Sequence, residues 1–272
     1  MLDGRKNDLK KITKIEVQKK NEQRFNIYID EAFACGVDIA VLTEFGLAKG
    51  MEVTDELLEQ LTDHETHRKA INRALVYLGA RVRSEKEVIE DLQKKEYEED
   101  AIDAAMLYLR ENKFVDDNAF AKMFCRTMVN TTLKGPQTIK RELRQKGIGE
   151  NDTEEALEYF TDELQDEHLY KVLTKAARTQ HNVSQVKLKQ KLQTTVMTKG
   201  YFNNKDIMDA VLQEFVSDEE EEDALKLQYE KFERKFSKYK GYERKSKIVK
   251  GLMQKGFRYE DIQNFLAAQE EY

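Results

Sequence analysis

The sequence predicts a mainly α-helical protein, built of tandem three-helix repeats in an extended, curved array and preceded by a small α+β module that contains a β-hairpin. Two observations carry this prediction. The chain has one proline and 12 glycines in 272 residues, which favours long helices over irregular loops. A similar string, ending in a helix-stop signal, recurs about every fifty residues, and such a period indicates a repeat array. Its anchors are Tyr97, Ile148, Tyr201 and Phe257.

The N-terminal stretch, residues 1–64, differs from the rest and is predicted to form the α+β module. Apolar and polar residues alternate over Ile12–Val17 and again over Arg24–Asp30, which is the pattern of a β-hairpin. Val37–Phe45 is predicted to form a short helix, Gly50–Val53 a third strand and Asp55–Leu61 a second helix. A sheet of two or three strands is marginal by itself, so the module should pack on the helices that come after it in the chain.

From residue 65 onward we expect four three-helix repeats, at 65–117, 118–166, 167–223 and 224–272. In each copy a helix with an aliphatic stripe ends in Lys-Gly or its equivalent, a second amphipathic helix follows a polar turn, and a third helix leads to the next copy. A three-helix unit of this size buries only a modest core. Stacking the units would bury their remaining apolar faces and place stability mainly in contacts between neighbours.

The single proline and the repeated Lys-Gly pair mark the two ends of one type of helix. Pro136 opens this helix in the second copy, where proline is tolerated because the N–H that it lacks would have no partner. In the first copy the same helix starts at a capping box formed by Ser84 and Glu87. A left-handed glycine should close the helix in the other three copies, at Gly147, Gly200 and Gly256. The first copy has Glu96 at this position, so its helix should end at a greater conformational cost or by a different route.

The residues indicate no active site, no cofactor and no metal site, and the sequence predicts that the protein is not an enzyme. It contains no glycine-rich phosphate loop and no dinucleotide fingerprint. His64 and His67 are spaced like a metal pair but have no third ligand nearby, so a solvated helix explains them better. Asp116-Asp117 is typical of a helix cap that also complements the helix dipole. The acidic run Glu219–Glu222 is expected to be a solvated hinge between the third and fourth repeats.

The two cysteines, Cys35 and Cys125, lie far apart and lack CxxC spacing, so free thiols in a reducing cytoplasm are expected. We find no signal-peptide pattern at the N-terminus and no apolar run long enough to span a bilayer. These features predict a cytoplasmic protein without a membrane partner or a small-molecule substrate.

Charge displayed on a helical scaffold is the remaining candidate for function. The net charge of -6 hides segregation of charge along the chain. One basic cluster in the second repeat consists of Lys134, Lys140, Arg141, Arg144 and Lys146. A second lies in the basic stretch Lys226–Arg258, whose aromatic residues Tyr229, Phe232, Phe236 and Tyr239 have the spacing of a helix core. From it we take Lys238, Lys240, Arg244, Lys245 and Lys247 as further candidates for binding a protein partner or nucleic acid.

Three strings, in this order, resemble the bacterial RecX regulatory protein family, and in particular the longer members from Gram-positive Firmicutes. The resemblance covers roughly residue 71 to the C-terminus, and the first copy departs from it at Lys95–Tyr97, where the glycine is missing. The strings are Arg83-Ser84 with Glu87-Val88 and Leu92, Phe114–Asp117 with Phe120-Ala121 and Arg126, and Gly135-Pro136 with Ile139, Glu142-Leu143 and Lys146–Ile148.

The resemblance implies tandem three-helix repeats that bind RecA and lie in the helical groove of the RecA–DNA filament. It implies inhibition of the recombinase, ATPase and co-protease activities of RecA, and so a role in DNA repair and the SOS response. Some members of the family also bind DNA. We therefore expect the array to bridge neighbouring RecA protomers, with its basic clusters against acidic protein surface or phosphate.

Two alternatives stay open. The first is a stand-alone protein that binds single- or double-stranded DNA with helix-turn-helix-like repeats, which predicts affinity for DNA without RecA and a steep loss of binding with salt. The second is a generic helical scaffold for protein assembly.

Overall fold

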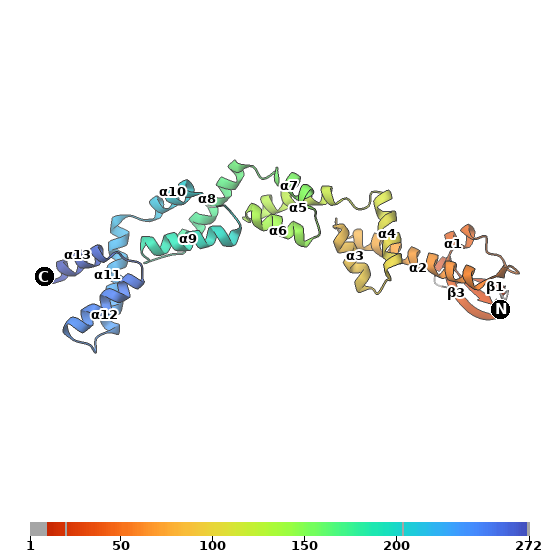
Figure 1. Cartoon of the computed structure of the whole chain (residues 1–272), viewed down its shortest axis with the longest axis horizontal. Coiled ribbons are helices and arrows are strands. Elements are labelled where there is room, and N and C mark those ends of the chain that lie inside the picture. Colours follow the sequence, from red (N-terminus) through yellow and green to blue (C-terminus); the bar gives the residue numbers. More distant parts are fainter. Residues whose placement is uncertain (1–9, 20, 203, 271–272) are drawn as a thin grey trace, which may run out of the picture. The chain divides into compact units, whose positions relative to one another are not determined.

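The computed structural model of the chain describes residues 10–19, 21–202 and 204–270. Thirteen helices and four strands lie in these residues, so the protein is mainly α-helical, as predicted (Figure 1). The chain divides after Phe120 into two compact parts. Among the described helices, none combines the length and the apolar character that crossing a bilayer would require.

A four-stranded antiparallel sheet opens the first part, in the order β3-β2-β1-β4. β1 (Lys10–Gln18) and β2 (Asn21–Ile29) form the predicted hairpin, and β4 (Glu52–Val53) falls within the strand predicted at Gly50–Val53. The side chains of Ile12, Ile27, Val37 and Leu61 are completely buried in the core of this module.

One strand is absent from the sequence-based prediction. β3 (Ala32–Asp38) pairs with β2, and the helix predicted at Val37–Phe45 begins only after it, as α1 (Ile39–Glu44). The turn between β2 and β3 places Asp30 and Glu31 at φ angles of 46° and 71°. Tight hairpin turns with two left-handed residues usually carry asparagine or glycine. The sequence lacks that signal here, and so it does not predict the second hairpin.

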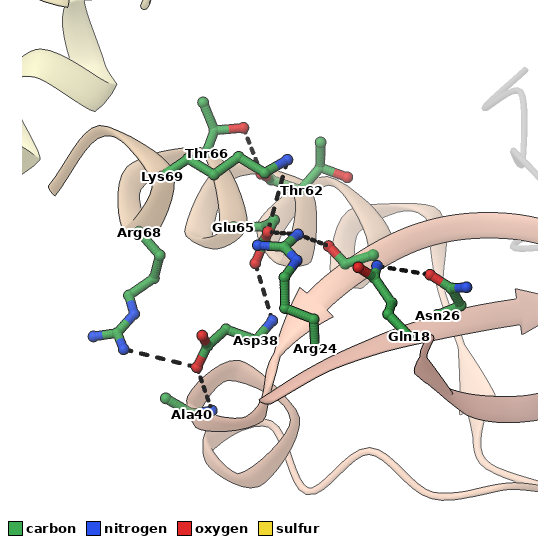
Figure 2. A network of polar contacts seen from close by, with 11 residues as sticks. Gln18, Arg24, Asn26, Asp38, Ala40, Thr62, Glu65, Thr66, Arg68 and Lys69 are labelled. Atoms are coloured by element: carbon green, nitrogen blue, oxygen red, sulfur yellow. Dashed lines mark hydrogen bonds and ion pairs between the residues drawn. The ribbon is translucent and has the colours of Figure 1, made fainter. Parts of the chain in front are cut away.

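The helix predicted at Asp55–Leu61 begins there but runs on as α2 (Asp55–Leu78). Figure 2 shows how this helix is tied to the sheet through Glu65, whose side chain is almost fully buried. The Glu65 carboxylate pairs with Arg24 of β2 and accepts a 3.1 Å hydrogen bond from the backbone N–H of Asp38. The other end of α2 packs in the first three-helix repeat, so one continuous helix belongs to both the sheet module and that repeat.

Each repeat consists of one longer helix followed by two others (Figure 1). The first repeat is α2 with α3 (Glu85–Lys94) and α4 (Glu99–Glu111), and the second is α5 (Asp117–Thr131), α6 (Pro136–Gln145) and α7 (Glu150–Leu157). The third is α8 (Asp162–Arg178), α9 (Gln185–Lys199) and α10 (Lys205–Phe215), and the fourth is α11 (Asp218–Lys235), α12 (Gly241–Gln254) and α13 (Tyr259–Glu270).

The boundaries expected after residues 64, 117, 166 and 223 each fall inside one of the longer helices α2, α5, α8 and α11. The sequence-based prediction has such a helix at the end of each copy. In the structure it opens the next one, where α2 packs on α3 and α4, and α8 packs on α9 and α10. In the structure, each repeat therefore begins at its longer helix.

The helices α3, α6, α9 and α12 end in the same way in all four repeats. The closing residue is left-handed, with φ of 61° at Glu96 and 80–91° at the three glycines that replace it, Gly147, Gly200 and Gly256. The following residue donates its N–H to the carbonyl five positions earlier. That carbonyl lies in the last turn and would otherwise lack a hydrogen-bond partner within the helix. These bonds run from Tyr97 to Leu92, Ile148 to Leu143, Tyr201 to Val196 and Phe257 to Leu252. The exits predicted at the three glycines are confirmed, and of the two routes left open for the first repeat, the structure has the left-handed one at Glu96.

In the second part of the chain, these helix exits also contact the preceding repeat. The Thr138 hydroxyl at the start of α6 donates a 2.9 Å hydrogen bond to the Lys199 carbonyl at the end of α9, and the Gly135 N–H donates to the same carbonyl at 2.7 Å. The Ser184 hydroxyl at the start of α9 donates to the Lys255 carbonyl at the end of α12 at 2.8 Å. We call these contacts the inter-repeat joints. The repeated Lys-Gly string thus joins repeats as well as ending helices.

The glycines at the joints leave no room for a side chain. A Cβ atom on Gly200 would lie 2.3 Å from the Thr138 hydroxyl oxygen, and one on Gly256 would lie 2.6 Å from that of Ser184. Both glycines also have the left-handed conformation that other residues adopt only at a cost. Two separate constraints therefore require glycine at each position.

Carboxylates from the following repeat cap two of the same helix starts. Asp117 accepts a 2.9 Å hydrogen bond from the N–H of Glu85, the first residue of α3, and Glu221 accepts one of 2.7 Å from the N–H of Gln185, the first residue of α9. Pro136 is the first residue of α6 and has no N–H, so no such cap is needed there.

The acidic run Glu219–Glu222 is therefore not the solvated hinge that the sequence predicted. It belongs to the first turn of α11, where Ser217 and Glu220 form a capping box. Burial raises the pKa of Glu221, which caps α9. Acidic residues are favoured at a helix N-terminus because they complement its dipole, and this explains the composition of the run without a hinge.

Candidate partner-binding surfaces

The basic cluster predicted on α6 is largely paired with carboxylates of its own repeat. Lys134 lies 2.8 Å from Glu142, and Arg144 lies 2.6 Å from Glu150, which also pairs with Lys140. Hydrogen bonds from Lys140 and Arg144 lower the pKa of Glu150 to about 2. Because its cations are partly neutralised, the cluster presents less positive charge than the sequence alone suggests.

Arg141 is the most available member of this cluster. It is exposed and lies on the side of α6 opposite the buried residues Ile139 and Leu143. Within the described part of the chain it makes no ion pair. Lys146, just beyond the helix end, is placed with its ammonium 5.5 Å from the centre of the Phe124 ring.

The second predicted cluster surrounds the turn between α11 and α12. Arg244 donates a 2.9 Å hydrogen bond to the Glu233 carbonyl, and Lys238 and Lys247 lie over the Tyr239 ring at 5.3 and 4.4 Å from its centre. Lys240 is the N-cap residue of α12, and Lys240 and Lys245 are both exposed. Two lysines of the turn thus lie over one aromatic ring, while Arg244 and Lys247 also pair with Glu233 and Glu243 at 3.4 and 3.6 Å.

The aromatic residues of this stretch divide between two roles. Tyr229, Phe232 and Phe236 pack against the buried core of the fourth repeat, as their spacing predicted. Tyr239 lies outside that core and supports the lysines instead, while Tyr242 is 88% exposed.

A third basic surface, which is absent from the sequence-based predictions, lies between the third and fourth repeats. It is a groove of about 670 Å³, with α9 on one side and residues of α11 and α12 on the other. Four lysines line it and no aspartate or glutamate does. None of these lysines forms an ion pair with another described residue. They are Lys187, Lys191, Lys235 and Lys255.

One wall of this groove could have been noticed in the sequence, because the stretch that forms it contains no acidic residue. No aspartate or glutamate occurs between Arg178 and Asp206, in a chain of which 36% is charged. The same stretch holds five lysines, namely Lys187, Lys189, Lys191, Lys199 and Lys205. The sequence-based prediction selected the stretches with the most basic residues. This stretch has fewer basic residues, but it has no acidic residues that could pair with them.

The remaining chemically active side chains make local contacts. His67 lies 3.1 Å from Asp100 and His64 lies 3.9 Å from Glu44, and among the described residues no three potential ligands converge on one point. Burial raises the pKa of Cys125 to about 11 and also raises the pKa of Cys35, so both thiols are protonated at neutral pH.

A small antiparallel sheet followed by jointed three-helix repeats defines a class of helical-repeat proteins whose charged surfaces lie on the repeats and between them. Four family profiles match the chain in this order: the regulatory protein RecX N-terminal domain at residues 10–54, and the first, second and third RecX three-helix domains at 70–109, 116–157 and 219–266. The third repeat, α8–α10, lies outside these four ranges.

The chain belongs to the RecX family. It is 38% identical to the regulatory protein RecX of Listeria welshimeri, over 96% of this chain and 97% of that protein, and 36% identical to the one of Limosilactobacillus reuteri, over 96% and 98%. A crystal structure of regulatory protein RecX matches with a TM-score of 0.66 at 36% identity, covering 75% of this chain and all of that one. RecX from Lactobacillus salivarius matches with a TM-score of 0.50 at 34% identity, over 56% and 97%.

Proposed function

We propose that this protein binds RecA and the RecA–DNA filament in the cytoplasm and inhibits the recombinase, ATPase and co-protease activities of RecA. It would thereby modulate DNA repair, recombination and the SOS response, and it would act by binding and not by catalysis. The observation that carries the proposal is the similarity, along 96% of the chain, to proteins named regulatory protein RecX.

The repeat architecture supports binding to a polymer of identical subunits. Several similar units follow one another along the chain, and each exposes charged residues on helices of the same type. When one chain contacts several protomers, each further contact forms at a high effective concentration, so individually weak contacts add up to tight binding. Such binding inhibits RecA if it favours a filament state that does not grow.

The α6 cluster is the first candidate for the contact with RecA, and its ion pairs shape the proposal. An acidic partner would have to compete with Glu150 for Lys140 and Arg144, whereas Arg141 is already exposed without a pair among the described residues. We therefore assign the leading role to Arg141. Lys134, Lys140, Arg144 and Lys146 would support it, and the cluster around α12 (Lys238, Lys240, Arg244, Lys245 and Lys247) would provide a second contact.

The test is inhibition of the DNA-dependent ATPase of RecA by the full chain. Reversing Lys140, Arg141 and Arg144 together to glutamate should abolish inhibition, but it also removes two partners of Glu150. Arg141→Glu alone leaves those pairs in place. It should raise the half-inhibitory concentration by about tenfold or more, because like charges facing each other across an interface are strongly unfavourable. Lys175→Glu, an exposed charge reversal on α8, is the matched control and should leave inhibition unchanged. Equal effects of the two substitutions would remove the α6 face from the proposal.

The second candidate function is DNA binding without RecA, and the acid-free groove between the third and fourth repeats is the observation that favours it. Filter binding on single- and double-stranded DNA, with and without RecA, separates the two candidates. Affinity that requires RecA supports the first, and affinity in its absence that falls steeply with salt supports the second.

A further inference from the structure

One exposed ridge of α11 carries acidic residues in its first half, basic residues in its second half and a leucine at its centre. Its members follow one another at intervals of four residues, and residues at this spacing form a continuous row on a helix surface. The four charged residues are exposed and the leucine is partly exposed. This α11 ridge consists of Glu219, Asp223, Leu227, Lys231 and Lys235.

The centre of the α11 ridge lies outside the part of the helix that packs in the core of the fourth repeat. The core contacts of α11 include Leu225, Tyr229 and Phe232, whereas Leu227 is not among the described residues that form this core or pack against it. One partly exposed leucine is common on protein surfaces. It becomes informative here because the charges on both sides of it are not neutralised by the fold.

The charges of the α11 ridge oppose one another within the helix. Glu219 and Asp223 are neighbours of like charge, and so are Lys231 and Lys235, and like charges at this spacing destabilise a helix. None of the four forms an ion pair with another described residue. The helix dipole favours acidic residues in the first turn and basic residues in the last one, but Asp223 and Lys231 lie further inside the helix.

Helix α8 shows how the same order of charges is neutralised within one helix when no leucine separates the two halves. The members of its ridge are Glu163, Glu167, Lys171 and Lys175. The two inner members, Glu167 and Lys171, form an ion pair. In α11 the inner acid and the inner base are eight residues apart, about 12 Å along the helix axis, which is too far for Asp223 to reach Lys231. Opposite charges for the α11 ridge must therefore come from another surface.

The α11 ridge is complementary to a second copy of itself that runs in the opposite direction. Two antiparallel copies of α11 that meet at Leu227 place Asp223 of each copy opposite Lys231 of the other. Glu219 and Lys235 then lie opposite each other as well, and Leu227 packs against its counterpart on the two-fold axis. Two-fold symmetry of this kind is the commonest in complexes of identical chains. From this complementarity we propose that the α11 ridge is a dimerisation surface, on which a second copy of this chain packs antiparallel.

Other occupants fit the α11 ridge less well. Two parallel copies would place like charges opposite one another, which is strongly unfavourable. A nucleic acid would bring its phosphates against Glu219 and Asp223, and a protein surface of one sign would be repelled by one half of the ridge. The contact is one helix wide and therefore smaller than a standard interface, so the dimer should be reversible and sensitive to salt. The inference is independent of the proposed binding to RecA.

The first experiment is sedimentation velocity of the full chain without RecA or DNA. It is run at about 0.05 M and about 0.5 M salt, because screening of exposed charges is weak in the first and strong in the second. One variant, Glu219→Lys with Asp223→Lys, makes the α11 ridge entirely basic. The other, Lys231→Glu with Lys235→Glu, makes it entirely acidic. Both variants keep a negative net charge, so attraction between whole molecules of opposite charge does not bring them together.

The control reverses two exposed lysines outside α11, Lys175→Glu with Lys250→Glu. At low salt we expect the control and the unsubstituted chain to dimerise alike, and each ridge variant to dimerise at least about tenfold more weakly, because each places like charges opposite one another. An equal mixture of the two ridge variants should form a heterodimer, which also shows that both are folded. An unsubstituted chain that stays monomeric, ridge variants that do not associate when mixed, or an equal loss in the control would each overturn the proposal.

The second experiment tests the antiparallel register by cross-linking. A disulfide requires two Cα atoms within about 7 Å. Leu227→Cys lies on the two-fold axis and should form a linked dimer under mild oxidation. Lys231→Cys should not, because in the antiparallel arrangement it lies about 12 Å along the axis from its counterpart. The unsubstituted chain, with Cys35 and Cys125, gives the background. Equal cross-linking of the two variants would overturn the antiparallel assignment.

Discussion

The side-chain hydroxyl of Ser184, which caps α9, donates a 2.8 Å hydrogen bond to the backbone carbonyl of Lys255, which closes the corresponding helix of the next repeat. Thr138 and Lys199 make the same kind of contact one repeat earlier, at 2.9 Å. The Lys-Gly ends of α9 and α12 therefore do two things: each satisfies the last carbonyls of its own helix and each contacts the preceding repeat. Because stability in a repeat protein depends strongly on interfaces between neighbours, substitutions at these joints should act on the coupling between repeats.

Gly200→Ala should destabilise the second part of the chain by more than the strain of a left-handed alanine. That strain costs about 1–2 kcal/mol. The added Cβ would also lie 2.3 Å from the Thr138 hydroxyl and 2.6 Å from the Thr138 nitrogen, and overpacking adds roughly 1–3 kcal/mol. The measurement is urea unfolding followed by circular dichroism.

Gly241→Ala is the matched control for this substitution. Gly241 also has a positive φ, of 56°, but a Cβ there would meet nothing within 4 Å. It should therefore show the backbone strain alone. If the two substitutions lower the unfolding midpoint equally, the close approach at the joint has no energetic consequence and the joint is not a stabilising contact.

Ser184→Ala should cost more than the loss of an ordinary helix cap. Removing a serine cap costs about 0.5–2 kcal/mol, and the hydrogen bond to the Lys255 carbonyl should add about 1 kcal/mol. Ser217→Ala is the comparison, because Ser217 caps α11 within a capping box and its side-chain hydrogen bonds stay within its own helix start. Hydrogen exchange at the amides near the end of α12 should accelerate in Ser184→Ala and stay unchanged in Ser217→Ala. The reverse pattern would contradict the role of the joint.

Local signals in the sequence predicted the local features of this fold. The Ser84–Glu87 capping box, the start of α6 at Pro136 and the left-handed exit at Gly147 are all confirmed, because each depends on residues within one or two turns of helix. The features that could not be predicted depend on contacts between distant residues. Asp117 and Glu221 have ordinary helix-start sequences, and only the fold brings their carboxylates to the N–H groups of Glu85 and Gln185.

The candidate binding surfaces also depend on contacts between residues that are distant in the sequence. Basic residues could be located from the sequence, but their pairing could not, because Glu150 lies on α7 and reaches Lys140 and Arg144 across a turn. The sequence could have indicated Lys187 and Lys191 of the groove through the absence of acids around them. Only the packing of two repeats places Lys191 and Lys255 on opposite walls of one groove.

Glu65→Ala should loosen the sheet module from α2. The substitution leaves the Arg24 guanidinium without its buried partner and the Asp38 N–H without its acceptor. Breaking a buried ion pair on one side typically costs about 3–5 kcal/mol, and the partial exposure of Arg24 places this case at the low end. The specific readout is faster hydrogen exchange at the Asp38 amide. Glu59→Ala, an exposed position on the same helix, should leave that exchange rate unchanged. Protection of Asp38 that survives Glu65→Ala would show that the sheet holds it by other means.

Glu150→Gln should remove part of the sensitivity of the second repeat to acid. The pKa of Glu150 is lowered from 4.5 to about 2 in the folded chain, so its carboxylate stabilises the fold above about pH 4.5, and this contribution is lost as the pH falls toward 2. The variant has no proton to bind at this position. The difference in urea midpoint between the two proteins should therefore be largest above pH 4.5 and shrink steadily between pH 4.5 and 2. Low salt is required, because the pair is exposed and screening would weaken it. Glu154→Gln, which removes only a 3.6 Å contact to Lys140, should give a smaller difference. Midpoints that run parallel for Glu150→Gln and the unsubstituted chain across this window would mean that Lys140 and Arg144 do not hold Glu150 in solution, and the α6 cluster would then be as freely basic as its sequence suggests.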